Sequence, residues 1–264
     1  LDLTPYLPEP TAGEQAARES KDAAFPAWPT TPIDFSPLTA INADLSATTD
    51  GIVMPTMAFG RSALAVKITD GVLDANLREV NLYDGGGSAS LRVNAARATP
   101  ALQTTLDLKG LNARNFARDV LGMSRLSGIG GVNTTLTMTG NNVDSFVRTL
   151  NGTGSILLDK GKFEGIDLGK IIATANTLIS GYSQGSFDTA VLLTAVSDAR
   201  GPASETQFSQ LDSPFTISNG VVSSSNIMLR GPLYMIAGEG TVNLPDQRID
   251  MAFLPTVFAS LEDE

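Results

Sequence analysis

The alternation of apolar and polar residues that begins after Ile41 constrains the fold of this 264-residue chain more than any other feature. In residues 62–69 (SALAVKIT), the side chains of Leu64, Val66 and Ile68 lie on one side of an extended backbone, and the intervening side chains lie on the other. A period of two is typical of a β-strand with one buried face. This segment therefore predicts a half-buried strand.

Turn signals separate segments of this kind. Asp70-Gly71 divides residues 62–69 from 72–82, Asn219-Gly220 divides two later apolar runs, and residues 158–163 (LDKGKF) fit the same strand-turn-strand unit. Asp-Gly and Asn-Gly supply the positive φ angles that tight hairpin turns need. We expect about a dozen antiparallel strands at this spacing. Beyond the first two, they are residues 88–95, 101–108, 132–139, 154–158, 227–230, 233–238, 240–244 and 249–254.

The pattern predicts a mainly β fold with minor helical content: a long antiparallel sheet of repeated hairpins with a few amphipathic helices packed against it. Asp167 can cap one helix, which would end near Gly181. The apolar stripe of this amphipathic helix consists of Leu168, Ile171, Ile172, Ala175, Leu178 and Ile179. Shorter helices are expected at residues 113–121 and 143–150. Residues 190–210 are ambiguous, because residues 190–195 could form a buried strand or a short helix.

Prolines divide the chain into two parts. Half of the 14 prolines fall within the first 37 residues, and a segment so rich in proline cannot form the interior of a sheet. We expect residues 1–37 to be a solvated Pro-rich arm or linker. Residues 38–264 are expected to form the β-domain, with a possible internal boundary near residue 150.

The composition argues against ordinary catalysis and against nucleic acid. The chain has no histidine and no cysteine, so the commonest general base and the usual zinc ligands are missing. We therefore expect no enzyme activity, no catalytic residue, no cofactor and no metal. The formal net charge of −10 and the lack of a basic stripe exclude nucleic acid as an expected partner. The same charge disfavours a polybasic membrane contact, so a link to a membrane must be apolar.

The remaining candidates for chemistry have simpler explanations. Asp74 and Asp84 lie at predicted strand ends and turns, where solvated or turn-forming roles are usual. The glycine runs at residues 85–87 and 128–131 precede strands, whereas a phosphate-binding loop precedes a helix. We expect wide turns or bulges at both glycine runs.

The apolar side chains of the predicted strands have two interpretations. They could be the inner face of a sandwich, buried under a second sheet, or part of them could line an open groove for acyl chains, because lipid-carrying sites are concave and apolar. Periodicity does not separate these two alternatives. The candidates are Leu64, Val66, Ile68, Leu73, Leu77, Leu91, Val93, Leu106, Leu108 and Leu136.

Two sequence blocks point to a family. Their motifs are Leu-Asn-Gly-Thr-Gly at 150–154, Gly-Ile-Asp-Leu at 165–168, Thr-x-Phe at 206–208, Ile-x-Asn-Gly-Val at 217–221 and Gly-x-Gly at 238–240. Together, the blocks resemble the C-terminal region of the AsmA family, and the resemblance covers residues 60–255.

The resemblance implies a curved β-groove whose apolar interior binds or conducts phospholipids, or other acyl-chain lipids, between the inner and outer membranes in support of outer-membrane biogenesis. It implies a location in the periplasm of a Gram-negative bacterium, with the full-length protein anchored to the inner membrane by an N-terminal helix absent from this chain. The alternative is a non-catalytic structural or interaction module that assists outer-membrane protein assembly, with envelope assembly proteins as partners. The resemblance implies no catalytic residues.

Overall fold

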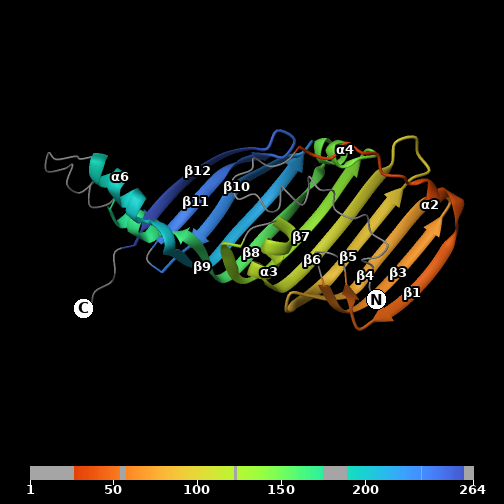
Figure 1. The fold of residues 1–264 in the computed structure, drawn as a ribbon, viewed down its shortest axis with the longest axis horizontal. Coiled ribbons are helices and arrows are strands. Elements are labelled where there is room, and N and C mark those ends of the chain that lie inside the picture. Colours follow the sequence, from red (N-terminus) through yellow and green to blue (C-terminus); the bar gives the residue numbers. More distant parts are fainter. Residues whose placement is uncertain (1–26, 54–57, 122–123, 175–188, 233, 259–264) are drawn as a thin grey trace.

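A computed structural model describes residues 27–53, 58–121, 124–174, 189–232 and 234–258. They form one antiparallel sheet of 12 strands in the order β1-β3-β4-β5-β6-β7-β8-β9-β10-β11-β12, with β2 paired to β3. The sheet is open and curled, and its strands lie side by side in sequence order (Figure 1). The strands are β1 (Ala43–Thr49), β2 (Ile52–Val53), β3 (Ala58–Thr69), β4 (Val72–Leu82), β5 (Gly85–Asn94), β6 (Ala101–Asn112), β7 (Leu126–Thr139), β8 (Asn151–Ile166), β9 (Arg200–Ser218), β10 (Val221–Arg230), β11 (Tyr234–Asn243) and β12 (Arg248–Val257).

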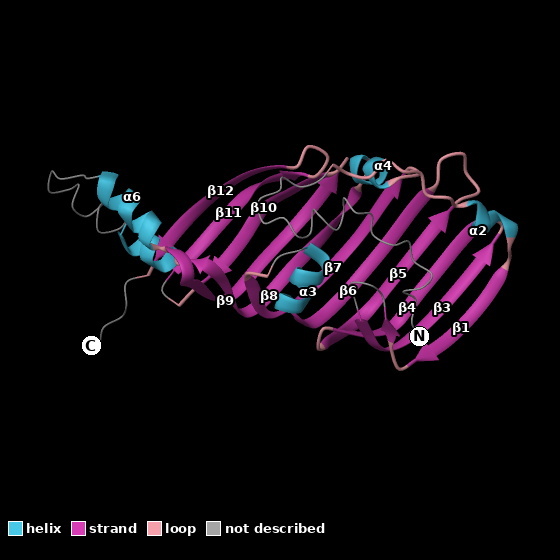
Figure 2. Ribbon diagram, viewed as in Figure 1, coloured by secondary structure: helices cyan, strands magenta, loops and turns pink. Residues whose placement is uncertain are grey.

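The predicted fold class is confirmed: the chain is mainly β, and most strands pair with their neighbours in sequence. Two of the expected hairpin turns have positive φ at both central residues, with Asp70 at 49° and Gly71 at 77°, and Asn219 at 49° and Gly220 at 78°. This conformation matches the right-handed twist of the flanking strands. Among the described residues no second sheet covers the first, so the sandwich interpretation is wrong (Figure 2).

The hairpin predicted at residues 158–163 is also wrong. β8 continues through this segment, and Lys162 lies opposite Ser127 of β7 and Gln207 of β9. Lys160 has a positive φ of 50°, and the register with β7 shifts next to it, which indicates a bulge where a turn was expected. The chain keeps its direction because the residues after the bulge find strand partners on both sides.

The glycine runs differ from each other. Residues 85–87 open β5 directly, with Gly87 opposite Leu108 of β6, while the turn before them is made by Tyr83 and Asp84, both at positive φ. The expected wide turn is therefore displaced by two residues. Residues 128–131 lie inside β7, whose register with β8 shifts between Ser127 and Ile129, so the expected bulge is present there.

The helices lie in three places: at one end of the strands, over one face of the sheet, and next to the start of β9 (Figure 1). They are α2 (Ser36–Ala40), α3 (Ala113–Leu121), α4 (Val143–Arg148), α6 (Thr189–Asp198) and the helical residues 168–174. α3 has the predicted bounds, and α4 ends two residues early. The ambiguous segment forms α6 and then continues as β9. Asp167 caps as predicted, because its Oδ1 accepts the backbone N–H of Lys170 at 2.9 Å. The other predicted stripe residues, Ala175, Leu178 and Ile179, and the predicted end near Gly181 lie outside the described residues.

The described part of the Pro-rich arm contacts the end of the sheet. The backbone N–H of Ile33 donates to the carbonyl of Asn141 at 2.6 Å, and Trp28 Nε1 donates to the carbonyl of Leu244 at 2.8 Å. Phe35 packs edge-to-face on Phe146 of α4, with ring centroids 6.4 Å apart. Near residue 150, β7 and β8 pair over most of their length, so the sheet is continuous there.

Buried apolar side chains gather in three clusters along the sheet. α3 lies across the strands and covers part of one face (Figure 2). Phe116 of α3 packs against the first cluster, Ala113 is part of the second, and Ile172 is part of the third. The sheet residues of the clusters are Val80, Leu82, Leu108, Leu111, Leu158, Phe208, Tyr234 and Ile236.

Candidate functional site

The strand register gathers the predicted apolar side chains on one face. Residues directly opposite one another in paired strands project to the same side of a sheet. Leu64 lies opposite Leu77, Leu77 opposite Ala89, and Ala89 opposite Leu106. The same register places all ten candidates on this side, which we call the apolar face: Leu64, Val66, Ile68, Leu73, Leu77, Leu91, Val93, Leu106, Leu108 and Leu136.

Burial along the apolar face is uneven. Leu108 and Val93 are only 2% and 4% exposed, whereas Leu91 is 38% exposed and the other seven candidates are half-buried. Leu108 belongs to the cluster under Phe116 of α3, so it is a core residue. Part of the apolar face is thus protein core, and part remains accessible.

Between β7 and β12 the apolar face contains a pocket of about 560 Å³, which we call the apolar pocket. Thirteen of its fourteen lining residues have apolar side chains, and Thr206 is the exception. The lining residues are Leu126, Phe163, Ile166, Leu168, Ile171, Ile172, Thr206, Phe208, Leu211, Ile227, Leu229, Ile236, Phe253 and Pro255.

Sheet and helix each supply part of this pocket. Leu211 of β9, Leu229 of β10 and Ile236 of β11 lie opposite one another in register and line its sheet side. The opposite wall comes from the helical residues after Asp167, where Ile172 is 7% exposed and packs with Ile236. The predicted stripe residues Leu168, Ile171 and Ile172 therefore line the pocket, as a helix with one apolar side is expected to do.

The polar groups near the pocket are satisfied within the protein. Thr206 Oγ1 donates to the carbonyl of Ile166 at 2.7 Å and accepts the N–H of Leu168 at 2.9 Å. The hydroxyl of Tyr234 donates to the carbonyl of Gln207 at 2.7 Å. Because the hydroxyls of Thr206 and Tyr234 are already hydrogen-bonded within the protein, the pocket offers a ligand mainly apolar contacts.

The sequence pattern did not predict most of the sheet residues in the pocket, and the reason is physical. The register between β10 and β11 shifts between Ser224 and Ile227, and β8 has its bulge near Lys160. Each shift changes which alternate residue faces the core. A strict period of two therefore does not place Ile227, Leu229 and Phe163 on the apolar face. The dense apolar content of residues 206–255 was the one available signal.

A second pocket, of about 710 Å³, adjoins the apolar pocket at the ends of the strands. Phe163 and Ile166 line both pockets. We call the second one the arginine pocket. Its lining residues are Ser124, Arg125, Phe163, Glu164, Gly165, Ile166, Arg200 and Gly201.

Glu164, which lines the arginine pocket, and Glu205, which lies opposite it in β9, are already paired. Arg114 of α3 binds Glu164, and its hydrogen bond lowers the pKa of that carboxyl. Lys162 Nζ binds Glu205 Oε2 at 2.8 Å and likewise lowers the pKa of Glu205. Both carboxylates are therefore ionised at neutral pH, with their charges matched by these two cations.

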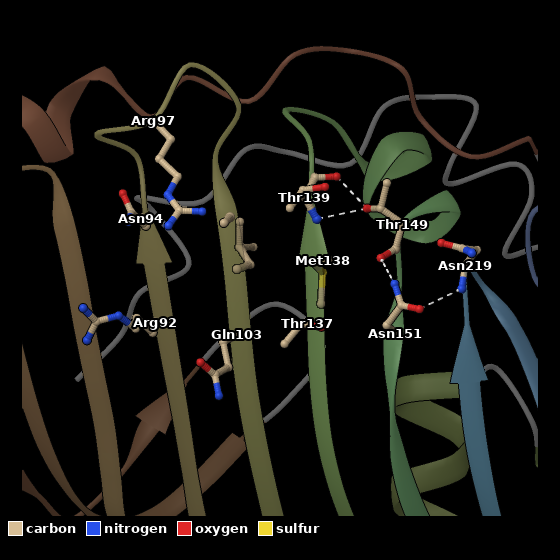
Figure 3. A pocket seen from close by; sticks show the side chains of 12 residues that line it. Arg92, Asn94, Arg97, Gln103, Thr137, Met138, Thr139, Thr149, Asn151 and Asn219 are labelled. Atoms are coloured by element: carbon tan, nitrogen blue, oxygen red, sulfur yellow. Dashed lines mark hydrogen bonds between the residues drawn. The ribbon is translucent and has the colours of Figure 1, made fainter.

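The opposite face of the sheet carries a polar pocket of about 450 Å³, lined in part by Arg92, Arg97 and Gln103 (Figure 3). Its side chains mainly hold strand ends together. Asn151 Nδ2 donates to the carbonyl of Thr149 at 2.8 Å, and Asn151 Oδ1 accepts the N–H of Asn219 at 3.1 Å. These hydrogen bonds hold the backbone of the strand ends in place, and they indicate no catalytic arrangement.

The acidic residues considered above have structural partners. Asp74 pairs with Arg92 at 2.7 Å, and Asp84 accepts from Nδ2 of Asn112, the last residue of β6, at 3.3 Å. Among the described residues, no cluster of potential metal ligands is present. No helix in the described part of the chain is long and apolar enough to span a membrane.

The fold and site define a class: an open antiparallel sheet with one apolar face and an apolar pocket walled by a helix. A family model described as the AsmA family matches residues 7–227, and the chain belongs to this family. Membership implies an envelope-associated protein. The match begins inside the Pro-rich arm and ends within β10, so it starts earlier than the sequence motifs suggested. No curated protein and no solved structure matches the chain.

Proposed function

We propose that this chain binds acyl chains of phospholipids in the apolar pocket and along the apolar face, and so conducts lipid between the inner and outer membranes. The full-length protein would act in the periplasm, anchored to the inner membrane, in support of outer-membrane biogenesis. One observation carries the proposal: a pocket of about 560 Å³ in which Thr206 supplies the only polar side chain.

The size and lining of the pocket suit an acyl chain. Its volume falls within the roughly 300–1,000 Å³ typical of small-molecule sites. Burial of apolar surface contributes about 25 cal/mol per Å², and an acyl chain has no polar group that would lose hydrogen bonds to water on entry. No lining side chain of the apolar pocket is an acid or a base, so the pocket suits binding and not acid–base chemistry.

The apolar pocket lies on the same side of the sheet as the apolar face. Leu211 and Leu158 lie opposite each other, Leu158 lies opposite Gly130, and Gly130 lies opposite Leu111. The pocket is thus in register with the strands that carry the ten candidates. Partial exposure at Leu91 leaves room for a lipid on that stretch, and membership of an envelope-associated family supports the same function.

A second candidate function rests on the edge strand β12. Its outer side has no strand partner among the described residues, and Ile249, Phe253 and Leu254 are 70%, 58% and 71% exposed. An unpaired apolar edge can accept a strand from another protein. On this alternative, the chain would be a structural module for envelope assembly proteins.

Native mass spectrometry of the full chain purified from Gram-negative cells tests the first proposal. We expect bound phospholipid in the wild type and loss of most of it in Ile227→Trp, because the indole would fill the pocket. Leu157→Trp is the matched control, since Leu157 precedes Leu158 in β8 and so lies on the opposite face. A chain that retains no lipid, or an Ile227→Trp variant that retains as much as the control, would overturn the proposal. Capture of a partner strand by β12 without lipid would favour the second candidate.

A further inference from the structure

Two arginines, Arg125 and Arg200, lie next to the apolar pocket. The guanidinium groups of Arg125 and Arg200 make no hydrogen bond or ion pair within the described part of the chain, although both line the arginine pocket. Other arginines of the described part, such as Arg78, also have no side-chain partner, but Arg125 and Arg200 are the two that line the arginine pocket. The nearby carboxylates, Glu164 and Glu205, are matched by Arg114 and Lys162.

The backbone brings both arginines to one point of the sheet. Arg200 lies opposite Ile166 in the register of β8 and β9, so the two side chains leave the sheet on the same side. Ile166 lines the apolar pocket, and Arg200 therefore projects toward its rim. On the other side of β8, the carbonyl of Arg125 accepts the N–H of Glu164 at 2.8 Å.

Gly165 makes room for Arg125. This glycine has a φ of 99°, and a Cβ placed on it would lie 3.1 Å from Arg125 Nη1. The guanidinium thus lies over the glycine, between the bulged end of β8 and solvent. A larger residue at this position would be strained in the backbone and would press on the arginine.

We propose that Arg125 and Arg200 bind the anionic head of an amphiphile whose acyl chain occupies the apolar pocket. This inference rests on the proposed function and specifies its substrate class as acyl lipids with a net negative head group. Guanidinium groups bind phosphate and carboxylate oxygens through paired N–H donors. Phe163 and Ile166 line both pockets, so head and chain of one molecule can occupy them together.

The test is a competition between two head groups. Wild-type protein is equilibrated with vesicles of phosphatidylglycerol and phosphatidylcholine in equal amounts, with identical acyl chains, and the bound lipid is then quantified by mass spectrometry. We expect enrichment of phosphatidylglycerol by roughly tenfold, which corresponds to about one charge-assisted hydrogen-bond pair. In Arg125→Gln/Arg200→Gln, the enrichment should disappear while phosphatidylcholine remains bound.

Two control variants and one competitor complete the design. Arg97→Gln, in the polar pocket of the opposite face, should keep the enrichment, and Arg125→Lys/Arg200→Lys should keep part of it because the charge remains. Excess inorganic phosphate should leave phosphatidylglycerol bound. If phosphate removed the enrichment completely, the arginines would hold a free anion and the proposal would be wrong. Equal retention of both lipids by the wild type would overturn this inference and leave the proposed function intact, whereas retention of neither would overturn both.

Discussion

The hydroxyl of Thr206 joins strand β9 to the first turn of the helix that begins at Leu168, 38 residues earlier in the chain. It accepts the N–H of Leu168 at 2.9 Å and donates to the carbonyl of Ile166 at 2.7 Å. Thr206 is only 2% exposed, so water cannot easily replace it at either group. One side chain therefore fixes the helical wall of the apolar pocket to the sheet.

Replacing Thr206 by valine keeps the shape of the side chain and removes both hydrogen bonds. We expect the free energy of unfolding to fall by about 1–3 kcal/mol, because two partly buried backbone groups lose their partner. Urea denaturation measures the change. Thr206→Ser retains the hydroxyl and should recover most of the stability. A valine variant as stable as the wild type would show that the helix is held by apolar contacts alone.

The apolar face of β3 to β7 is predicted to act as a path for lipid. Leu91→Glu places a charge on the exposed part of this face, and an unpaired charge against an acyl chain is costly. We expect vesicle-to-vesicle lipid transfer to slow by about tenfold or more, equivalent to about 1.4 kcal/mol, with lipid in the apolar pocket retained. Gln103→Glu adds the same charge on the opposite face and should transfer lipid normally. Equal slowing in both variants would show that lipid does not move along the apolar face.

The Asn219-Gly220 turn is predicted to be sensitive to substitution at the glycine. Gly220 has a φ of 78°, and a Cβ there would lie 2.7 Å from Pro245 Cδ and against the carbonyl of Val147. Gly220→Ala should destabilise the protein by more than about 1 kcal/mol. Gly71→Ala is the comparison, since its φ is 77° and its nearest contact, Thr39 Cγ2, is at 3.1 Å. The Gly220 variant should be the less stable of the two by chemical denaturation. The reverse order would contradict this description of the packing.

Burial raises the pKa of Tyr83 to about 12, and the neighbouring Asp119 carboxylate adds to the effect. In the unfolded chain the pKa is about 10. Between about pH 10 and pH 12 the folded protein keeps a proton that the unfolded chain loses, so the free energy of unfolding should fall as the pH rises through this window. Tyr83→Phe should show a smaller fall when urea midpoints are compared across the window. An identical pH dependence in the two proteins would count against a buried, neutral tyrosine at this position.

Local sequence signals predicted much of the sheet. Asp70-Gly71 and Asn219-Gly220 form the expected hairpin turns, and the alternation of Leu64, Val66 and Ile68 predicted one shared face. The bounds of α3 and the cap at Asp167 were also readable, because caps and apolar stripes are encoded within a few residues.

The pocket could not be predicted in the same way. Its lining depends on bulges, such as the one at Lys160, that a strict alternation does not anticipate. It also depends on Thr206 and Leu168 meeting across 38 residues of sequence. Whether an apolar strand face is covered is decided by the tertiary arrangement, so a sandwich and an open sheet have the same local pattern.

Photo-crosslinking from two adjacent residues of β10 tests the central claim most directly. Leu229 lines the apolar pocket, Met228 precedes it on the opposite face, and both are half-buried. A photoreactive residue is placed at each position in turn, and the full chain is irradiated with phospholipid vesicles. The account predicts lipid adducts at residue 229 and few or none at residue 228. Equal labelling at both positions, or no adduct at residue 229, would contradict it.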